Sequence, residues 1–326
     1  MPARFCTCFG ALCVVLWAAA CPAADTNDYP NRPVRLIVPQ APGSASDTVA
    51  RIIAAEVGTR LKQQVVVDNR PGGALLLGLE LTAKAPPDGY TIGYGMIGAM
   101  AISPHVVARP PLDVQKDLAP IVQMTTGQML LAAGNATSLK SVRDIVAYAK
   151  QNPGKLNYAS SGNGTPGHVG FELFKFMTGT DIVHVPYKGG AAGIADLMAG
   201  QVQLMLESTN SITPHVKAGR VRGLATTGSK RASALPELPT VAEAGVPGYE
   251  ATTWSGIVAP AGLPKPLVAR LNAEFNKVAE SATYREKVAP IGSEPAGGTS
   301  EQFREFIRSE SAKWGNIVRR SGARID

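Results

Sequence analysis

The sequence predicts an α/β fold with a largely parallel sheet that is divided between two lobes. Short runs rich in β-branched residues alternate with segments of helical periodicity, and Gly, Pro and Asn cluster between them. This alternation begins near residue 34 and starts again near residue 141, which indicates two units. The length of 326 residues suits two domains of ordinary size. Because 45% of the residues are hydrophobic, the chain can bury a core and is not a disordered tail.

The first unit opens with a predicted βαβαβ arrangement. Strands are expected at 34–38, 65–67 and 90–94, with a helix over 46–61 and a second helical stretch before the third strand. The long helix carries apolar residues at helical spacing, namely Val49, Ile52, Ile53, Val57 and Leu61.

The second unit repeats this alternation. Helices are expected at 141–151, 165–178 and 191–199, and strands at 156–160, 182–186, 202–206 and 221–226. A strand over 254–260 then leads into a helix with the apolar stripe Leu267, Leu271, Phe275 and Val278. Thr299 and Gln302 have capping-box spacing at the start of a last helix.

The first 23 residues are typical of a cleavable secretory signal peptide. Arg4 is their only charged residue, an apolar stretch runs from Phe9 to Ala20, and small residues precede Ala24. The apolar stretch is shorter than the roughly 20 residues that a membrane-spanning helix needs. We therefore expect cleavage after Ala23 and export, with lipid attachment at Cys21 as the less favoured alternative.

All cysteines lie within this leader, so the exported chain is expected to contain no thiol. That excludes disulfides, thiol catalysis and cysteine-ligated metals. The exported chain would keep a formal charge of about +6, the chain's +7 less Arg4. Its Lys and Arg residues are dispersed, with pairs such as Arg319-Arg320 but no dense tract, so we expect no nucleic-acid partner.

The sharpest local motif is Gly-Asn-Gly-Thr-Pro-Gly at 162–167, between a predicted strand and a predicted helix. Its spacing is that of a dinucleotide-binding loop, but the acidic residue expected about 20 residues later is missing from 185–188. Backbone amides at a helix N-terminus can also bind a carboxylate or phosphate. Thr165 equally suits a plain N-cap with Pro166 after it. Nucleotide site, anion site and helix cap are the three alternatives.

Two further loops join strands to helices. Residues 42–47 follow the first strand, and Ser44 and Asp47 have capping-box spacing there. Residues 184–191 carry the phenol of Tyr187 and the ammonium of Lys188. Because open α/β sheets bind ligands at the carboxyl ends of their strands, we expect one loop from each lobe to close on a single anion.

Catalytic patterns are missing from the sequence. The histidines at 105, 168, 184 and 215 show no metal-ligand spacing. Ser160-Ser161-Gly162 lacks the leading glycine of a nucleophile elbow. We therefore predict no metal site, no cofactor and no enzymatic activity.

Six motifs follow one another along the chain: Pro-Asn-Arg-Pro-Val-Arg at 30–35, Asp-Asn-Arg-Pro-Gly at 68–72, Pro-Asp-Gly-Tyr-Thr at 87–91, Ser-Ser-Gly-Asn-Gly-Thr-Pro-Gly-His at 160–168, Val-Pro-Tyr-Lys-Gly at 185–189 and Leu-Pro-Thr-Val-Ala-Glu-Ala-Gly at 238–245. Together they resemble the Bug (TctC-like) family, the periplasmic solute-binding receptors of tripartite tricarboxylate transporters. The resemblance extends from about Tyr29 to the end of the chain.

The resemblance implies a two-lobed, periplasmic-binding-protein-like (type II) fold with a ligand cleft between the lobes. It places residues 25–124 and 252–326 in the first lobe and residues 125–251 in the second. A carboxylate would be held between the first-strand loop and the glycine-rich loop, with Asp47 orienting its loop rather than contacting the anion. The implied ligand-binding residues, together with Tyr187 from the third loop, are Gly43, Ser44, Ala45, Ser46, Asp47, Gly98, Ser160, Gly162, Asn163, Gly164, Thr165, His168 and Glu207.

Several residues depart from the family pattern and bear on the ligand. Gln40 stands where an aromatic residue is usual, and Glu207 where an Asp is common. Apolar residues also replace polar ones at Ala74–Leu77 and at Ile97, Ala99 and Met100. These departures predict a less polar distal pocket that favours an aliphatic or aromatic carboxylate, including dicarboxylates.

The resulting prediction is a monomeric periplasmic receptor that captures a small organic carboxylate by lobe closure and delivers it to membrane transporter subunits. One rival is a sensory receptor that presents its closed form to a membrane kinase, which genomic neighbours or a pull-down would distinguish. The other is an exported enzyme that acts on the same acids, which would not release its ligand unaltered.

Overall fold

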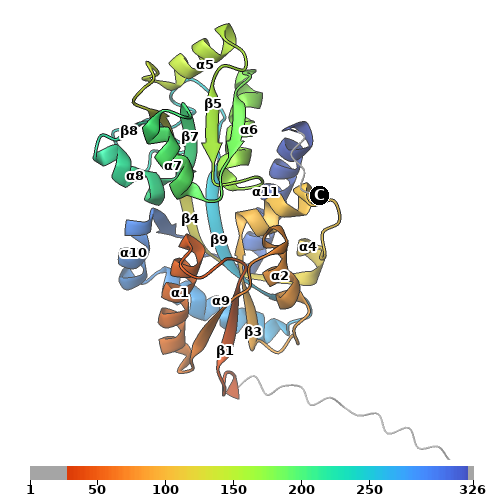
Figure 1. The fold of residues 1–326 in the computed structure, drawn as a ribbon. Coiled ribbons are helices and arrows are strands. Elements are labelled where there is room, and N and C mark those ends of the chain that lie inside the picture. The colour runs from red at the N-terminus through yellow and green to blue at the C-terminus, as the bar shows by residue number, and fades with distance from the viewer. Residues whose placement is uncertain (1–27, 322–326) are drawn as a thin grey trace, which may run out of the picture.

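The computed structural model describes residues 28–321, which form two α/β lobes joined by long strands (Figure 1). The signal peptide predicted at 1–23 lies outside the described residues. Strand β4 (Leu118–Gly134) pairs antiparallel with β9 (Thr252–Pro260) over residues 118–128. From Met129 onward β4 pairs with strands of the second lobe instead. One continuous strand therefore links the two lobes, and its partners change beside the space between them.

The first lobe has a sheet in the order β2-β1-β3-β9-β4, with β1 parallel to both β2 and β3. Its helices cover this sheet, and β10 adds a short antiparallel pair to β4. Besides β4 and β9, its elements are β1 (Val34–Val38), α1 (Ala45–Leu61), β2 (Val65–Asn69), η2 (Gly73–Leu75), α2 (Leu76–Ala83), β3 (Thr91–Met96), the π-helix η3 (Gly98–Ile102), α3 (Ser103–Val106), α4 (Val114–Asp117), α9 (Lys265–Ala279), α10 (Ala282–Val288), η4 (Ala289–Ile291), β10 (Ser293–Pro295) and α11 (Ser300–Ser321).

The second lobe continues the sheet through β4-β7-β5-β6, with β5 parallel to both of its neighbours. β8 pairs antiparallel with β4. The elements are α5 (Val142–Gln151), β5 (Asn157–Ser160), α6 (Pro166–Thr178), β6 (Val183–Pro186), α7 (Gly190–Ala199), β7 (Leu204–Ser208), α8 (Thr209–Lys217) and β8 (Val221–Thr226).

Local chemistry explains why these elements form where they do. The predicted stripe of α9 is buried throughout, and the capping box before α11 forms reciprocally between Thr299 and Gln302, at 2.8 and 3.1 Å. Helix α11 packs against η3, β4 and α6, and so contacts both lobes. Its buried Glu310 accepts hydrogen bonds from the indoles of Trp254 and Trp314, each at 2.9 Å. The two-lobed α/β fold predicted from the sequence is confirmed.

Between residues 28 and 321, no helix combines the length and the apolar composition needed to cross a bilayer.

Candidate functional site

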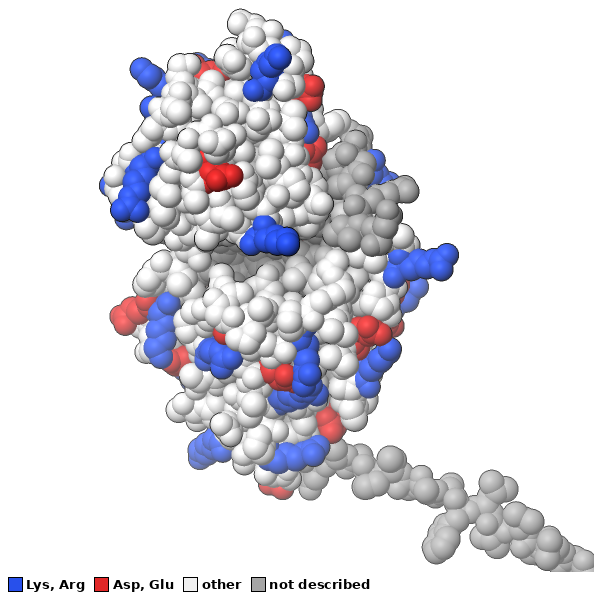
Figure 2. All heavy atoms as spheres, in the orientation of Figure 1, with Lys and Arg blue, Asp and Glu red and all other residues white. Residues whose placement is uncertain are grey.

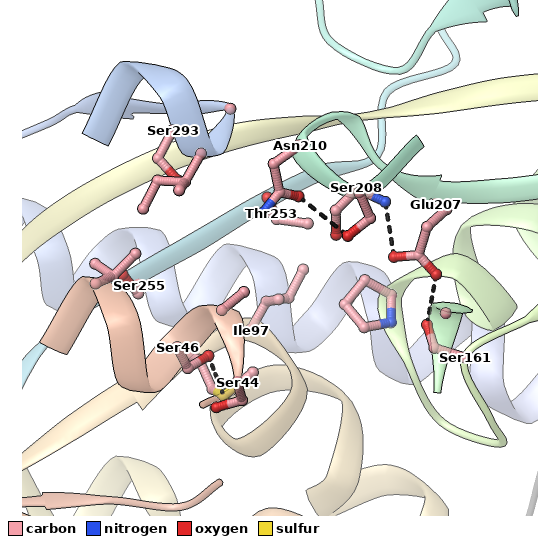
Figure 3. Close-up of a pocket in the computed structure, with 18 of the residues that line it drawn as sticks. Ser44, Ser46, Ile97, Ser161, Glu207, Ser208, Asn210, Thr253, Ser255 and Ser293 are labelled. Carbon is pink, nitrogen blue, oxygen red and sulfur yellow. Dashed lines mark hydrogen bonds between the residues drawn. The ribbon is translucent and has the colours of Figure 1, made fainter. Parts of the chain in front are cut away.

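A cavity of about 510 Å³ lies between the two lobes and is lined by residues of both. Figure 2 shows the hollow as a break between the upper and lower halves of the molecule, with one Lys or Arg side chain at its upper edge and mostly uncharged surface elsewhere around it. Figure 3 shows polar side chains of both lobes turned toward it, among them Ser44 and Ser46 from one side and Glu207 and Ser161 from the other. The cavity is therefore a site that only the two lobes together complete.

The first-lobe wall is the loop between β1 and α1 and the first turn of that helix. Ser44 caps α1 by accepting a hydrogen bond from the amide of Asp47 at 3.2 Å. The amides of Ala45 and Ser46 precede the first intrahelical bonds, and both residues line the cavity. This end of α1 therefore directs free N–H donors and the positive end of a helix dipole at the cavity.

Asp47 stabilises this loop on the side that faces away from the cavity, and it is not a lining residue. Its carboxylate accepts hydrogen bonds from the amide of Gly43 at 2.8 Å, from Asn69 at 3.0 Å and from Arg51 at 3.0 Å. Asn69 also donates to the carbonyl of Gln40 at 3.0 Å, so both ends of the loop are tied to one network. Burial alone would raise the pKa of Asp47, but these hydrogen bonds and the charge of Arg51 outweigh it and hold that pKa below its usual value.

Hydroxyl groups cover the floor of the cavity beside this loop. Thr125 and Ser255 lie 2.5 Å apart at their oxygens, on the paired strands β4 and β9. Tyr94 is buried beside these hydroxyls and Ser46, and burial raises its pKa to about 12 although the neighbouring hydroxyls act to lower it. These groups can donate to or accept from a neutral or anionic ligand without carrying charge themselves.

The glycine-rich loop of the second lobe uses most of its own amides. Those of Gly162 and Gly164 donate to the side chains of Ser160 and His168, at 3.2 and 3.0 Å. The amide of Thr165 donates to the carbonyl of Gly162 at 3.3 Å, and Thr165 caps α6. The alternative of a plain helix cap therefore has direct geometric support, and few amides of this loop remain for a ligand.

Two stacked histidines lie under this loop. The rings of His168 and His184 are 4.1 Å apart, and His184 also stacks on Tyr158 at 4.8 Å. His184 forms a 2.7 Å hydrogen bond with Ser160. Burial lowers the pKa of each histidine to about 4, helped by Lys175 at His168 and by the mutual repulsion of the pair at His184. The neutral ring of His168 is what allows its Nδ1 to accept the amide of Gly164.

Two other helices of the second lobe begin at the cavity without a side-chain cap. Gly189 precedes α7 and Ser208 precedes α8, and neither accepts a capping hydrogen bond through its side chain. Gly190 and Ala191 of α7 line the cavity, as do Thr209, Asn210 and Ser211 of α8. The first amides of both helices lack an intrahelical acceptor, so they are available to an anion.

Glu207 lies at the end of β7, between these two helix starts, and is 7% exposed. It accepts hydrogen bonds from the hydroxyl of Ser161 at 2.8 Å and from the amide of Ser208 at 2.9 Å. A Cβ placed on Gly190 would be 2.8 Å from Glu207 Oε2, so a larger residue there would require this carboxylate to move. Among the lining residues it is the one with a formal charge.

The segment of η4 and β10 closes the cavity from the first lobe. Ile291, Gly292 and Ser293 line it opposite the start of α8. Gly292 has φ +66°, and a Cβ there would lie 2.6 Å from Thr209 Oγ1 and 2.9 Å from the amide nitrogen of Asn210. Ser233 of the second lobe also donates to Glu294 at 3.2 Å. The two lobes are therefore in close contact at this glycine.

The structure brings only part of the predicted set to the cavity. Ser44, Ala45, Ser46, Thr165 and Glu207 line it. The others do not line it. Gly43 is exposed in the first loop, Asp47 is buried beneath that loop, and Gly98 is buried in η3 next to the lining residue Ile97. Ser160, Gly162, Gly164 and His168 lie in or under the glycine-rich loop, Asn163 is exposed on it, and Tyr187 donates to Asp196 at 2.6 Å.

The residues that depart from the family pattern are also divided. Gln40 and Ile97 line the cavity, whereas Ala99 and Met100 belong to the hydrophobic core. Ala74 and Leu77 line a separate groove on the first lobe. The prediction of a less polar pocket therefore depends on Ile97, which was named among the departures, and on Val49 and Met96, which were not.

The cavity also contains residues that the sequence argument missed. They come from the start of α8, from η4 and β10, and from the strands that join the lobes, and comprise Gln128, Ser208–Ser211, Thr253, Ser255 and Ile291–Ser293. No loop motif marks them, because they meet only when segments far apart in the sequence pack together.

Two α/β lobes that are joined by strands and enclose a cavity lined by helix N-termini are the architecture of a solute-binding receptor. The sequence profile of the tripartite tricarboxylate transporter family receptor, TctC, matches residues 49–323. The chain therefore belongs to this family of periplasmic solute-binding receptors, and the predicted family is confirmed.

Individual relatives agree with this assignment. A UPF0065 protein from the tcbD-tcbE intergenic region of Pseudomonas sp. strain P51 is 37% identical, over 91% of this chain and 88% of its own. BugT of Bordetella pertussis is 34% identical over 94% of both chains. The structure of R. palustris Rpa4515 with adipate superposes with a TM-score of 0.82 at 37% identity, covering 91% of this chain and all of that one. MatC from Rhodopseudomonas palustris with bound malate gives 0.77 at 28%, over 89% of this chain and 100% of that one.

Proposed function

We propose that the protein binds a small organic carboxylate in the interlobe cavity and delivers it to the membrane subunits of a tripartite tricarboxylate-type transporter. The observation that carries this proposal is the convergence of α1, α7 and α8, whose N-termini line a cavity without a lysine or arginine in its wall. Each helix N-terminus acts as roughly half a positive charge and offers free amides. A carboxylate gains charge-assisted hydrogen bonds there from both lobes at once, which favours the closed state.

An aliphatic carboxylate suits this cavity best, with an aromatic acid as the alternative. A volume of about 510 Å³ is within the usual range for small-molecule sites. Val49, Met96 and Ile97 give it an apolar side against which methylene groups can pack. The relatives with adipate and malate support the carboxylate class. No covalent step is part of this proposal.

The proposed place of action is the periplasm, after removal of residues 1–23. A mature N-terminus at Ala24 in the periplasmic fraction, measured by mass spectrometry, would support it. A lipid-modified Cys21 in the membrane fraction would instead show that the protein is anchored.

A thermal-shift panel tests the binding proposal. The exported chain, unfolded and refolded to remove carried-over ligand, is mixed with aliphatic and aromatic mono-, di- and tricarboxylates, amino acids and NADP. A ligand at about 1,000 times its Kd adds roughly 4 kcal/mol to the free energy of unfolding, which raises the midpoint by several degrees. We expect such a shift with one class of carboxylate and recovery of that acid unaltered. A shift with NADP alone, or chemical alteration of the acid, would contradict the proposal.

Delivery is tested with the membrane subunits. Membranes that contain the transporter subunits should retain the ligand-bound protein in a pull-down and not the ligand-free form. Retention by a membrane kinase instead would identify a sensory receptor.

A further inference from the structure

We propose that Glu207 sets the specificity of the cavity by selecting a carboxylate ligand that also carries a hydrogen-bond donor, a hydroxyl or an ammonium, and by disfavouring a second carboxylate at that position. This inference rests on the proposed function, because it assumes that the ligand's first carboxylate lies at the helix N-termini. It concerns the group at the other end of the same ligand.

The position of Glu207 makes contact with a ligand difficult to avoid. Its carboxylate lines the cavity between the glycine-rich loop and the starts of α7 and α8. In Figure 3 it points toward Ser161, at the end of the cavity opposite Ser255 and Ser293. An elongated ligand that spans the cavity therefore places one of its ends near this side chain.

The hydrogen bonds of Glu207 leave part of its acceptor capacity unused. Ser161 donates to Oε2 and the amide of Ser208 donates to Oε1, one bond to each oxygen. An ionised carboxylate has about four acceptor positions and no proton to give. The remaining positions can be satisfied by a ligand that donates, and not by one that only accepts.

The negative charge of Glu207 has no cationic partner in the cavity. Lysine and arginine are missing from the lining residues, and the ion pairs formed within residues 28–321 do not include Glu207. Two carboxylates close together in a partly dehydrated site cannot both stay ionised without a large cost. A second ligand carboxylate would meet this repulsion, whereas an ammonium would remove it and a hydroxyl would avoid it.

The start of α7 reinforces this selection. Gly190 approaches Glu207 so closely that a Cβ would lie 2.8 Å from Oε2. The positive end of the α7 dipole thus already has an anion beside it, which offsets much of its attraction for another. The start of α8 also lies beside Glu207, because the amide of its N-cap Ser208 donates to this carboxylate. The start of α1 belongs to the other lobe and has no carboxylate among the lining residues, so the ligand's first carboxylate gains most there.

Calorimetric titration of matched acids tests the inference. The acids are adipate, 6-hydroxyhexanoate and 6-aminohexanoate, together with succinate, 4-hydroxybutanoate and 4-aminobutanoate, so that only the terminal group changes within each set. The proteins are the wild type, Glu207→Gln, and the control Glu237→Gln, which makes the same chemical change at an exposed residue of the second lobe. Ser161→Ala serves as a second variant of the same network that keeps the charge.

We expect the wild type, Glu237→Gln and Ser161→Ala to bind a hydroxy or amino acid at least about tenfold more tightly than the dicarboxylate of equal length. Glu207→Gln should gain at least about tenfold for the dicarboxylate, because its amide can donate to a carboxylate. A loss of affinity in Glu207→Gln that is larger for the amino acid than for the hydroxy acid would identify an ammonium as the natural donor. A larger loss for the hydroxy acid would identify a hydroxyl.

Two outcomes overturn the inference, and they differ from failure of the proposed function. Equal ratios in the wild type and Glu207→Gln would show that Glu207 does not select the ligand. If Ser161→Ala, which retains the carboxylate, no longer discriminates against the dicarboxylate, then the shape of the loop and not the charge of Glu207 selects the ligand. If no acid binds any of the four proteins, the aliphatic class favoured under the proposed function is wrong, and this inference fails with it.

Discussion

Asp47 is the residue whose role was deduced most fully from the sequence. Its spacing from Ser44 predicted a capping box, and electrostatic repulsion predicted that it would not contact an anionic ligand. In the structure its carboxylate binds Gly43, Asn69 and Arg51 behind the cavity wall. The partner Asn69 could not be anticipated, because it belongs to strand β2, which is distant in the sequence from the start of α1. The role of Asp47 in ligand binding remains a prediction.

Replacement of Asp47 by Ala should weaken ligand binding by about tenfold, or about 1.4 kcal/mol, through loss of the loop conformation. We also expect the free energy of unfolding to fall by about 1–3 kcal/mol, because buried donors lose their acceptor. The measurements are calorimetric titration and denaturant unfolding.

Asp144→Ala is the matched control for this variant. Asp144 forms the same capping box at the start of α5, where it accepts the amide of Lys140 at 2.9 Å, away from the cavity. It should leave ligand affinity unchanged. Unchanged affinity in Asp47→Ala as well would refute the role of Asp47.

The buried pair of His168 and His184 predicts how stability depends on pH. Both have a pKa of about 4 when folded, lowered mainly by burial, against about 6.5 when unfolded. Between these values the unfolded chain binds more protons than the folded chain. The contribution of the two neutral histidines to the free energy of unfolding is therefore fully present above about pH 6.5. It falls toward pH 4, by up to about 1.4 kcal/mol per pH unit for each histidine.

Urea unfolding between pH 7.5 and 4.5 measures this slope. His168→Asn should reduce it, since asparagine can still accept the amide of Gly164 but does not titrate. An identical slope in wild type and variant would exclude the histidine pair as the cause.

At the scale of elements, the regular βα units and the connecting strand β9 were predictable, and the connecting strand β4 was not. The bounds of β1, α1, β2 and β3 lie within about two residues of the expected ones. Strand β4 was not predicted, because Pro120 and Gly127 interrupt a strand pattern. In the structure the pairing of β4 with β9 shifts between Pro120 and Val122, which accommodates the missing N–H of the proline.

The glycine-rich loop shows the limit of motif reasoning. Its place between strand β5 and helix α6 was predicted correctly. The motif could not reveal that Ser160 and His168 already accept the amides of Gly162 and Gly164. Nor does a motif mark α8, whose uncapped start lines the cavity.

The close approach of η4 and β10 to α8 makes Gly292 a sensitive position. Gly292→Ala should weaken binding by about tenfold, because its Cβ would lie 2.6 Å from Thr209 Oγ1 and hold the lobes apart. The control is Gly262→Ala, where φ is +82° and no atom lies within 4 Å of the new Cβ. Both variants bear backbone strain of about 1–2 kcal/mol.

Comparison of the Kd of Gly292→Ala with the Kd of Gly262→Ala separates the effect of backbone strain from the effect of holding the lobes apart. Gly262→Ala should unfold more easily and bind as the wild type does. If both variants bind equally well, the lobes do not need this contact to hold a ligand.

At the scale of the whole molecule, sequence reasoning gave the two lobes, the family and the general location of the cavity. What remained hidden was how far-separated segments combine, since Ser46, Ser255 and Glu207 line one cavity from helix α1 and strands β9 and β7 of the two lobes. The absence of lysine and arginine from its wall is a property of this assembly that composition could not reveal, because the chain as a whole is basic. Binding of an anion by helix N-termini is thus an interpretation that only the fold makes possible.

The measurement that tests this interpretation most directly is calorimetric titration of adipate and 6-hydroxyhexanoate into a protein whose cavity is blocked. Ala191→Trp places an indole at the start of α7, where Ala191 lines the cavity, and Ala192→Trp makes the same change at the next exposed residue, outside the lining. The account predicts that the wild type and Ala192→Trp bind at least one of the two acids with similar Kd, and that Ala191→Trp gives no binding heat. Undiminished binding by Ala191→Trp, or no binding of either acid by the wild type, would contradict it.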